Sequence, residues 1–83
     1  MFYVYMLKSI DSEWRYTGST NDLRERLKKH NEGEVQSTKH FAPFKLEAYV
    51  AVNSEVKARA LEQYFKTGSG AAIMKKRILQ VPE

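Results

Sequence analysis

The first ten residues are apolar or aromatic at nearly every position, so both faces of an extended segment would be covered. This pattern is typical of a central strand, with Phe2, Val4 and Met6 on one face and Tyr3, Tyr5 and Leu7 on the other. The polar residues 11–13 favour a turn, and residues 14–20 are predicted to return as the second strand of a hairpin.

A helix is predicted to follow the hairpin, capped by Thr20 or Asn21 and ended by Gly33. Residues 34–42 show no period and are predicted to form a loop. Alternation over 44–51 then predicts a third strand, with four apolar residues on one face: Phe44, Leu46, Ala48 and Val50.

Asn53 or Ser54 is expected to start a second helix whose inner face carries Ala58, Leu61 and Phe65. The Gly-Ser-Gly sequence at 68–70 breaks that helix, and Ser69 is expected to cap a third helix that extends to about residue 79. The order β-β-α-β-α-α predicts an α/β (α+β) fold around a small, mostly antiparallel sheet.

Composition limits the chain to one predicted domain over residues 1–83, because 83 residues leave no room for a second core. The sequence has no cysteine, which excludes a disulfide framework, a thiolate zinc site and a cysteine nucleophile. No apolar run approaches a membrane span, and the first residues lack a basic leader, so we expect a soluble cytoplasmic protein. The formal charge of +4 permits a polyanionic partner without requiring one.

Two tyrosines are candidate site residues. An even number of residues in the hairpin loop would place Leu7 opposite Tyr16, so that Tyr16 shares a face with Tyr5 near Gly18. An odd number would send Tyr16 to the other face. A glycine there would let backbone and substrate approach closely. Spacing alone favours the plainer interpretation that these tyrosines are ordinary strand residues.

Arg26 and His30 are i, i+4 neighbours on the side of the first helix that carries Leu23 and Leu27. The arginine could clamp a phosphate, and the histidine could hold or transfer a proton. The spacing is equally consistent with a structural interpretation, in which Arg26 covers apolar surface and His30 is a capping or core histidine.

Glu62 is the strongest single candidate, because it lies at the edge of the inner stripe of the second helix. A carboxylate there needs compensation, and Mg²⁺ binds with few protein ligands and several waters. An ion pair with Arg26 or Arg59 is the common alternative. Further basic or polar residues could bind along a nucleic-acid backbone: Lys39, His40, Lys66, Ser69, Lys75, Lys76 and Arg77. For the last three, a solvated helix face is the alternative.

Taken in order, these residues resemble the GIY-YIG nuclease superfamily, in particular its small stand-alone bacterial members that are similar to the N-terminal domain of the excinuclease C protein. The matching positions cover nearly the whole chain and are Tyr3-Val4-Tyr5, Tyr16-Thr17-Gly18, Arg26, His30, Ser37-Thr38-Lys39-His40, Glu62 and Lys66-Thr67-Gly68-Ser69-Gly70. Tyr3, Val4 and Thr17 depart from the motif letters, and Leu61, Ala71 and Ala72 replace polar or basic residues of relatives.

The resemblance implies a three-stranded antiparallel sheet flanked by helices and a metal-dependent DNA endonuclease, with repair or recombination intermediates as possible substrates. It implies that Glu62 holds Mg²⁺, with Mn²⁺ as a possible replacement, and that Tyr5 or Tyr16 orients or deprotonates the attacking water. Arg26 would stabilise phosphoryl charge, and His30 would assist proton transfer or hold the substrate. A catalytically weak nucleic-acid-binding module and a small interaction domain are the alternatives. DNA capture would use the basic residues, a homodimer or a partner protein.

Overall fold

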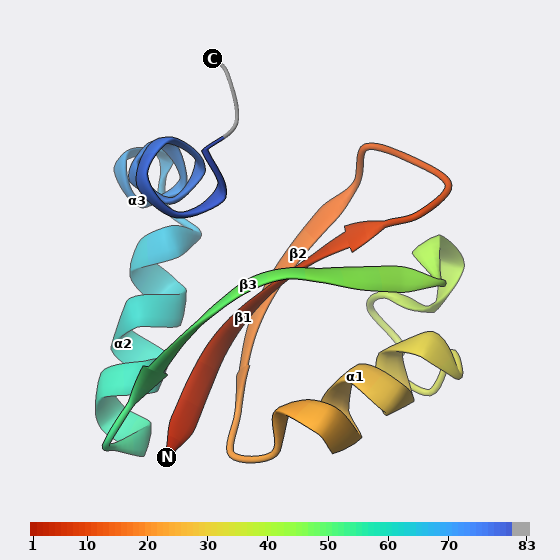
Figure 1. Cartoon of the computed structure of the whole chain (residues 1–83), viewed down its shortest axis with the longest axis horizontal. Coiled ribbons are helices and arrows are strands. Elements are labelled where there is room, and N and C mark those ends of the chain that lie inside the picture. The colour runs from red at the N-terminus through yellow and green to blue at the C-terminus, as the bar shows by residue number, and fades with distance from the viewer. Residues whose placement is uncertain (81–83) are drawn as a thin grey trace.

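A computed structural model describes residues 1–80 of the chain. Its elements follow the predicted order, which confirms the fold class (Figure 1). They are β1 (Phe2–Ser9), β2 (Arg15–Thr20), α1 (Leu23–Asn31), a short 3₁₀ helix η1 (Lys39–Phe41), β3 (Phe44–Val52), α2 (Glu55–Phe65), α3 (Gly68–Ile73) and a π-helical segment η2 (Met74–Leu79). The last residues of the predicted domain, 81–83, lie outside the described part.

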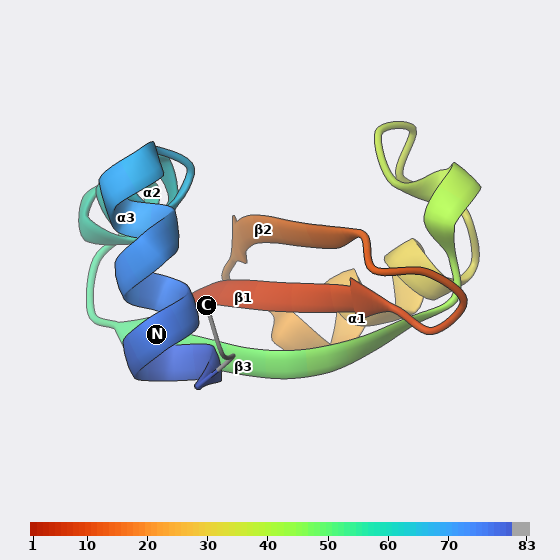
Figure 2. The same cartoon turned by 90° about the horizontal axis from the view of Figure 1, so that it is seen from above.

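The three strands form one antiparallel sheet in the order β2-β1-β3, so β1 is central as its two apolar faces predict. Helix α1 covers one face, and α2 with α3 covers the other face toward the opposite end of the strands (Figures 1 and 2). One core cluster forms on each face, around Tyr5 and Leu7 beneath α1 and around Val4 and Met6 beneath α2. Strand β2 is therefore an open edge between the two layers.

The hairpin has the register of an even loop, one of the two alternatives that the sequence left open. Leu7 pairs with Tyr16 and Tyr5 pairs with Gly18. Paired residues of antiparallel strands point to the same face, so both tyrosines lie on the α1 side of the sheet. Thr17 and Ser19 point to the α2 side for the same reason.

The third strand departs from the predicted alternation. Met6 pairs with Ala48, but Leu7 pairs with Leu46, so Glu47 is an extra residue in β3. This bulge reverses the side-chain alternation. The prediction of one apolar face was therefore wrong: Phe44 and Leu46 pack beneath α1, whereas Ala48, Val50 and Val52 pack beneath α2.

The helix ends follow the rules of capping but differ in the residues used. Asp22, rather than Thr20 or Asn21, caps α1 by accepting from the N–H of Glu25. Ser54 caps α2, as one of the two predicted alternatives. Gly33 follows α1 with φ +74°, a left-handed conformation that suits glycine and confirms its place at the end of the helix.

The cap of α3 was predicted wrongly. Thr67 starts this helix and its hydroxyl accepts from the N–H of Gly70, which leaves Ser69 exposed in the first turn. A threonine two residues earlier satisfies the same unpaired donors, so the prediction chose the wrong one of two nearby hydroxyl residues. No helix within residues 1–80 is long and apolar enough to cross a membrane.

Candidate active site

A chain of hydrogen bonds runs from helix α1 through the buried centre of the sheet to the loop that follows. The Tyr5 hydroxyl lies 2.8 Å from Nε2 of His30, and Nδ1 of His30 lies 2.8 Å from Oγ1 of Thr38. Arg26 Nε lies 3.4 Å from the Tyr5 oxygen at the outer end of the chain. His30 and Thr38 are fully buried, so the structure places His30 inside the core and not at the surface.

The partners assign the direction of these bonds. The guanidinium of Arg26 can only donate, and the Thr38 hydroxyl lies 3.4 Å from the carbonyl oxygen of Val35, which can only accept. The four bonds join Arg26 to Tyr5, Tyr5 to His30, His30 to Thr38, and Thr38 to Val35. A neutral imidazole satisfies all four when His30 carries its proton on Nδ1, donates to Thr38 and accepts at Nε2 from the Tyr5 hydroxyl. The network thus fixes the tautomer of His30 and directs the Tyr5 proton inward.

Burial explains the protonation of both groups. It lowers the pKa of His30 to about 4, and the nearby positive charge of Arg26 acts in the same direction. The imidazole is therefore neutral at pH 7. Burial also raises the pKa of Tyr5, although the hydrogen bond from Arg26 opposes the shift. Tyr5 is accordingly a neutral phenol whose oxygen holds Arg26.

Tyr16 occupies a different environment from Tyr5. Its ring is half-buried on edge strand β2, and its centroid lies 6.3 Å from that of Tyr5. Gly18 makes this approach possible, because a Cβ atom on Gly18 would lie 2.5 Å from the Tyr5 hydroxyl and 2.9 Å from Cε2 of Tyr16. The predicted gathering of two phenols near Gly18 is confirmed, with Tyr16 as the phenol that solvent can reach.

Glu62 lies on the other side of the β2 edge and has two partners. Its Oε1 accepts from the Ser19 hydroxyl at 2.6 Å, and its Oε2 pairs with the Lys66 ammonium at 2.7 Å. The alternative that Glu62 forms an ion pair is therefore correct, but its partner is Lys66 and not Arg26 or Arg59, because Lys66 follows one turn later and points to the same side. Burial acts to raise the pKa of Glu62, but the bonds from Lys66 and Ser19 outweigh it and leave the pKa below its ordinary value. The carboxylate is ionised at neutral pH.

Lys66 joins the two halves of the site. Its ammonium pairs with Glu62 on the α2 side and lies 5.6 Å from the centroid of the Tyr16 ring, which belongs to the α1 face. The ammonium thus lies at the edge of β2, where the two faces meet. The structure therefore brings together five of the predicted residues, with His30 behind them: Tyr5, Tyr16, Arg26, Glu62 and Lys66.

The donor set fits a divalent ion held by a single protein ligand. Among residues 1–80 no three His, Asp or Glu side chains come together as a metal cluster. Glu62 nevertheless offers an ionised carboxylate with 16% of its side chain exposed, and each of its oxygens has a second lone pair. Mg²⁺ is commonly held by one or two carboxylates, waters and substrate phosphates, so one glutamate suffices. The Lys66 ammonium already lies against Glu62, so the space beside this carboxylate accommodates a positive charge.

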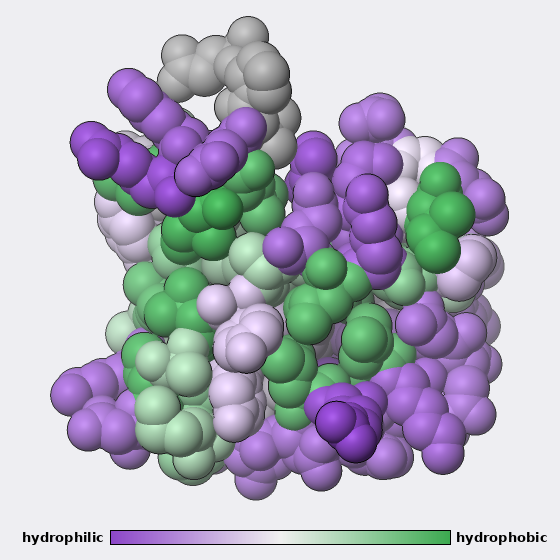
Figure 3. Space-filling view, viewed as in Figure 1, coloured by the Kyte–Doolittle hydropathy of each residue, from purple (hydrophilic) through white to green (hydrophobic). Residues whose placement is uncertain are grey.

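The remaining basic candidates do not form one group with this site. Lys39 and His40 are exposed on η1, which lies beside the turn of the hairpin (Figure 2). The other three lie on η2, which packs against α3 and β3, and hydrophilic side chains gather over that end of the molecule in Figure 3. These three are Lys75, Lys76 and Arg77, all exposed.

Two contributors were missed from the sequence. Thr38 was named only within the matching segment Ser37-Thr38-Lys39-His40 and was given no role, because the loop has no periodicity that marks it as buried. Ser19 had a usable signal, because the predicted hairpin register places it opposite Val4 and therefore on the face of the second helix. A polar residue at that position beside Glu62 is a natural hydrogen-bond partner.

Comparisons with known proteins point to one family. The family described as "GIY-YIG catalytic domain" matches residues 1–77. The chain is 40% identical over 67 residues to "UPF0213 protein CPE1444" of Clostridium perfringens, a match that covers 80% of this chain and 71% of the relative. It is 37% identical over 65 residues to "UPF0213 protein YazA" of Bacillus subtilis, covering 77% of this chain and 65% of that protein, slightly under two thirds. These names state no activity. No solved structure gives a significant match.

Proposed function

The chain belongs to the GIY-YIG nuclease family, and from this we propose that it is a metal-dependent endonuclease that hydrolyses DNA phosphodiester bonds. The observation that carries the proposal is the position of Lys66 between Glu62 and Tyr16. It places an ionised carboxylate and a solvent-accessible phenol at the same point of the β2 edge, on opposite faces of the sheet. Hydrolysis of a phosphodiester requires both an oriented nucleophile and positive charge near the phosphate.

In this proposal Tyr16 orients the attacking water by accepting a hydrogen bond at its phenol oxygen. We assign this part to Tyr16 because Tyr5 is 1% exposed and its hydroxyl is already bonded to His30 and Arg26. A buried phenol with a raised pKa is poorly placed to contact water or substrate. Tyr5 is therefore a positioning residue.

Arg26 is proposed to bind the phosphoryl oxygens. Its Nε is directed to Tyr5, and this bond orients the planar fork so that its two terminal nitrogens can donate to a phosphate. Arginine suits this part because it stays protonated at any working pH. His30 contributes indirectly, since it fixes the phenol that fixes Arg26.

Glu62 is proposed to hold the divalent ion, Mg²⁺ or Mn²⁺. Such an ion supplies Lewis-acid stabilisation of the charge on the phosphate and on the leaving 3′ oxygen. Ser19 keeps the carboxylate in place from the neighbouring strand. Lys66 would exchange its contact with Glu62 for one with the DNA backbone when the ion and the substrate bind.

DNA of the bacteria in which the relatives occur lies in the cytoplasm, so we place the proposed activity there. Capture of the substrate would use Lys39 and His40 on η1, with the η2 residues Lys75, Lys76 and Arg77 as a second contact. Branched and flap substrates of repair or recombination are the structures that we propose to compare first.

The experiment is a cleavage assay on supercoiled plasmid and on flap and branched oligonucleotides with Mg²⁺, Mn²⁺ or EDTA. We expect cutting that depends on the metal and disappears in Glu62→Ala. Metal-independent cutting, or full activity of Glu62→Ala, would contradict the assignment of the metal ligand. Binding without cutting under every metal would instead indicate a nucleic-acid-binding module.

One observation favours the interaction domain as a second candidate. A shallow groove of about 470 Å³ lies between α1 and β3, and hydrophobic surface occupies the middle of the face drawn in Figure 3. Leu23, Leu27, Leu46 and the 53% exposed Tyr49 line this groove. Loss of a protein partner from a groove variant such as Leu46→Asp, with DNA cleavage absent from the wild type, would support this alternative.

A further inference from the structure

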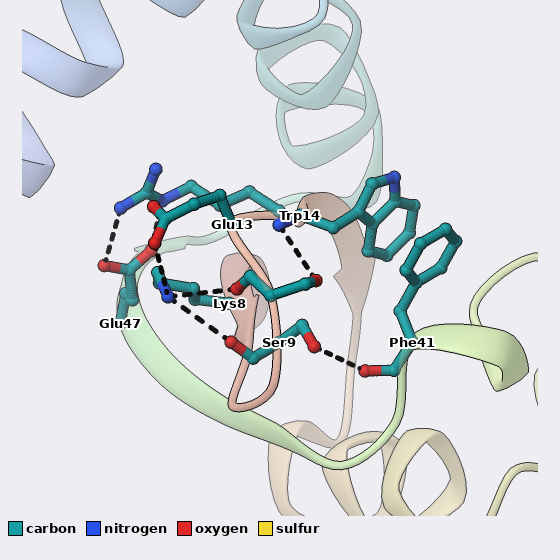
Figure 4. Close-up of polar contacts among 8 residues, drawn as sticks. Lys8, Ser9, Glu13, Trp14, Phe41 and Glu47 are labelled. Atoms are coloured by element: carbon teal, nitrogen blue, oxygen red, sulfur yellow. Dashed lines mark hydrogen bonds and ion pairs between the residues drawn. The ribbon is translucent and has the colours of Figure 1, made fainter.

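Three aromatic rings lead outward from the candidate active site. Tyr16 and Trp14 lie two residues apart on β2 and its preceding turn, with ring centroids 6.1 Å apart and an interplanar angle of 20°. Phe41 of η1 stacks on Trp14 at 4.1 Å and 8°. Figure 4 shows the Trp14 and Phe41 rings side by side, with Glu13 directed to the other side of the hairpin.

The outer ring is held in place before any ligand binds. The Ser9 hydroxyl, 1% exposed, donates to the backbone carbonyl of Phe41 at 2.7 Å, and the N–H of Phe41 donates to the carbonyl of Thr38. Ser9 of strand β1 and Thr38, the buried last member of the hydrogen-bond chain that includes Tyr5, therefore both hold the backbone of η1. A surface that needs no ordering on binding loses less free energy when a ligand docks.

The outer ring is also accessible and flanked by positive charge. Phe41 is 36% exposed although Trp14 covers one face of its ring, so a good part of the residue remains accessible to solvent. Lys39 and His40 precede it on η1 and are both exposed. An accessible aromatic residue beside a basic side chain matches a nucleotide, whose base stacks and whose phosphate carries negative charge.

We propose that Phe41, supported by Trp14, is a stacking platform for an unpaired base of a single-stranded DNA segment, with Lys39 at the adjoining phosphate. This inference rests on the proposed nuclease function and adds a substrate feature to it. Double-stranded DNA keeps its bases inside the helix and cannot use such a platform.

The spacing of the rings links the platform to the site. The two centroid separations place the Phe41 ring within about 10 Å of the Tyr16 ring. At the rise of about 3.4 Å per nucleotide of a B-form strand, the stacked base lies within about three nucleotides of a phosphate at Tyr16. The protein would therefore recognise unpaired DNA directly beside the position of cleavage.

Trp14 provides a direct measurement, since it is the single tryptophan of the chain. Its fluorescence is followed during titration with a 12-nucleotide oligo(dT) and with a 12-base-pair duplex in EDTA, where no metal-dependent cleavage occurs. The variants are Phe41→Leu, which removes the aromatic face, and Phe41→Tyr, which keeps it. Tyr49→Ala is the matched control, an exposed aromatic on β3 outside the platform. Thermal unfolding of each variant is recorded in parallel.

We expect oligo(dT) to quench Trp14 and to bind about tenfold more weakly to Phe41→Leu, while Phe41→Tyr and Tyr49→Ala bind like the wild type. Duplex affinity should change less than about twofold in Phe41→Leu, since the platform contributes only to unpaired DNA. Equal oligo(dT) affinity of Phe41→Leu and wild type, with altered thermal stability alone, would overturn the inference and show that the rings only close the hairpin. Preference for duplex, or for oligo(U) over oligo(dT), would overturn it as well.

The plasmid assay separates this result from the proposed function. Metal-dependent cleavage with no Phe41-dependent binding would reject the platform and leave the nuclease standing. Phe41-dependent binding of oligo(dT) without cleavage under any metal would retain the platform and reject the nuclease.

Discussion

The hydroxyl of Tyr5 donates to Nε2 of the fully buried His30 over 2.8 Å, so the histidine acts on the site through the tyrosine. This relationship separates the two tyrosines of the family motifs. Tyr5 belongs to the core and holds Arg26, whereas Tyr16 borders solvent and the Glu62–Lys66 pair. One hydroxyl therefore supports the fold, and the other is free to contact water and substrate.

The two tyrosines should respond differently to removal of the hydroxyl. Tyr16→Phe should lower single-turnover cleavage by about 100-fold or more, because the water loses its hydrogen-bond acceptor, with little change in stability. Tyr5→Phe should destabilise the fold by about 1–3 kcal/mol, because Nε2 of His30 loses its buried partner. Cleavage rates and urea unfolding of both variants measure the two effects. A stable, fully inactive Tyr5→Phe beside an active Tyr16→Phe would reverse the assignment.

Removal of the Thr38 hydroxyl should lower the free energy of unfolding, because this hydroxyl is fully buried and hydrogen-bonded. Thr38→Val keeps the shape of the side chain but removes the acceptor of the His30 Nδ1 proton, which should cost about 1–3 kcal/mol of unfolding free energy. Thr38→Ser keeps the hydroxyl and should lose less unfolding free energy than Thr38→Val. Nitrogen chemical shifts of His30 give a second test, with Nδ1 protonated and Nε2 unprotonated in the wild type. The opposite tautomer would contradict the direction of the chain.

Stability should fall when the pH drops below neutrality. The folded pKa of His30 is about 4 and lies below the unfolded value of about 6.5, so the unfolded state binds a proton first. The stabilisation is fully present above about pH 6.5 and is lost as the pH falls toward 4, with a magnitude of about 3 kcal/mol.

Urea unfolding at several pH values between 7.5 and 4.5 measures this slope. His40→Gln is the control, because it removes the other histidine of the chain, which is exposed on η1, and leaves the buried His30 in place. An NMR titration of the wild type reports His30 without any substitution. A folded His30 that titrates near pH 6.5 would contradict the buried, neutral imidazole.

Gly18 should not tolerate even one added methyl group. The Cβ of Gly18→Ala would lie 2.5 Å from the Tyr5 hydroxyl, so at least one of the two phenols must move. We expect a loss of about 2 kcal/mol in stability and a lower rate of cleavage. Gly68→Ala is the matched control, since nothing lies within 4 Å of a Cβ at that position. Wild-type behaviour of Gly18→Ala would show that the two phenols are not packed against the strand.

Much of the fold was predictable because its main patterns are local. The two apolar faces of residues 2–7 predicted a central strand. The pairing of Leu7 with Tyr16 was one of two registers that the sequence allowed, because the length of the hairpin loop could not be read from the pattern. The bulge at Glu47 was not predictable from alternation. The residues on either side of it are apolar, so a one-residue shift leaves an apolar residue in each face.

The sequence singled out residues that the fold brings together, but not the contacts they make. Glu62 stood out as a carboxylate at the margin of an apolar stripe, and the i, i+4 spacing of Arg26 and His30 placed both on the inner side of α1. The partner of Glu62 was assigned wrongly, because Lys66 was considered only as a nucleic-acid contact. Thr38 could not be identified, since burial of a loop residue depends on tertiary packing and has no periodic signal.

The most direct measurement is single-turnover cleavage by Glu62→Gln and Glu55→Gln with increasing Mg²⁺ or Mn²⁺. Both glutamates lie on α2 and form i, i+4 ion pairs, Glu62 with Lys66 and Glu55 with Arg59 at the distant end of the helix. Our account predicts at least about a 100-fold loss for Glu62→Gln that added metal does not restore, and no loss for Glu55→Gln. Equal activity of the two variants would contradict a metal-dependent site at the edge of β2.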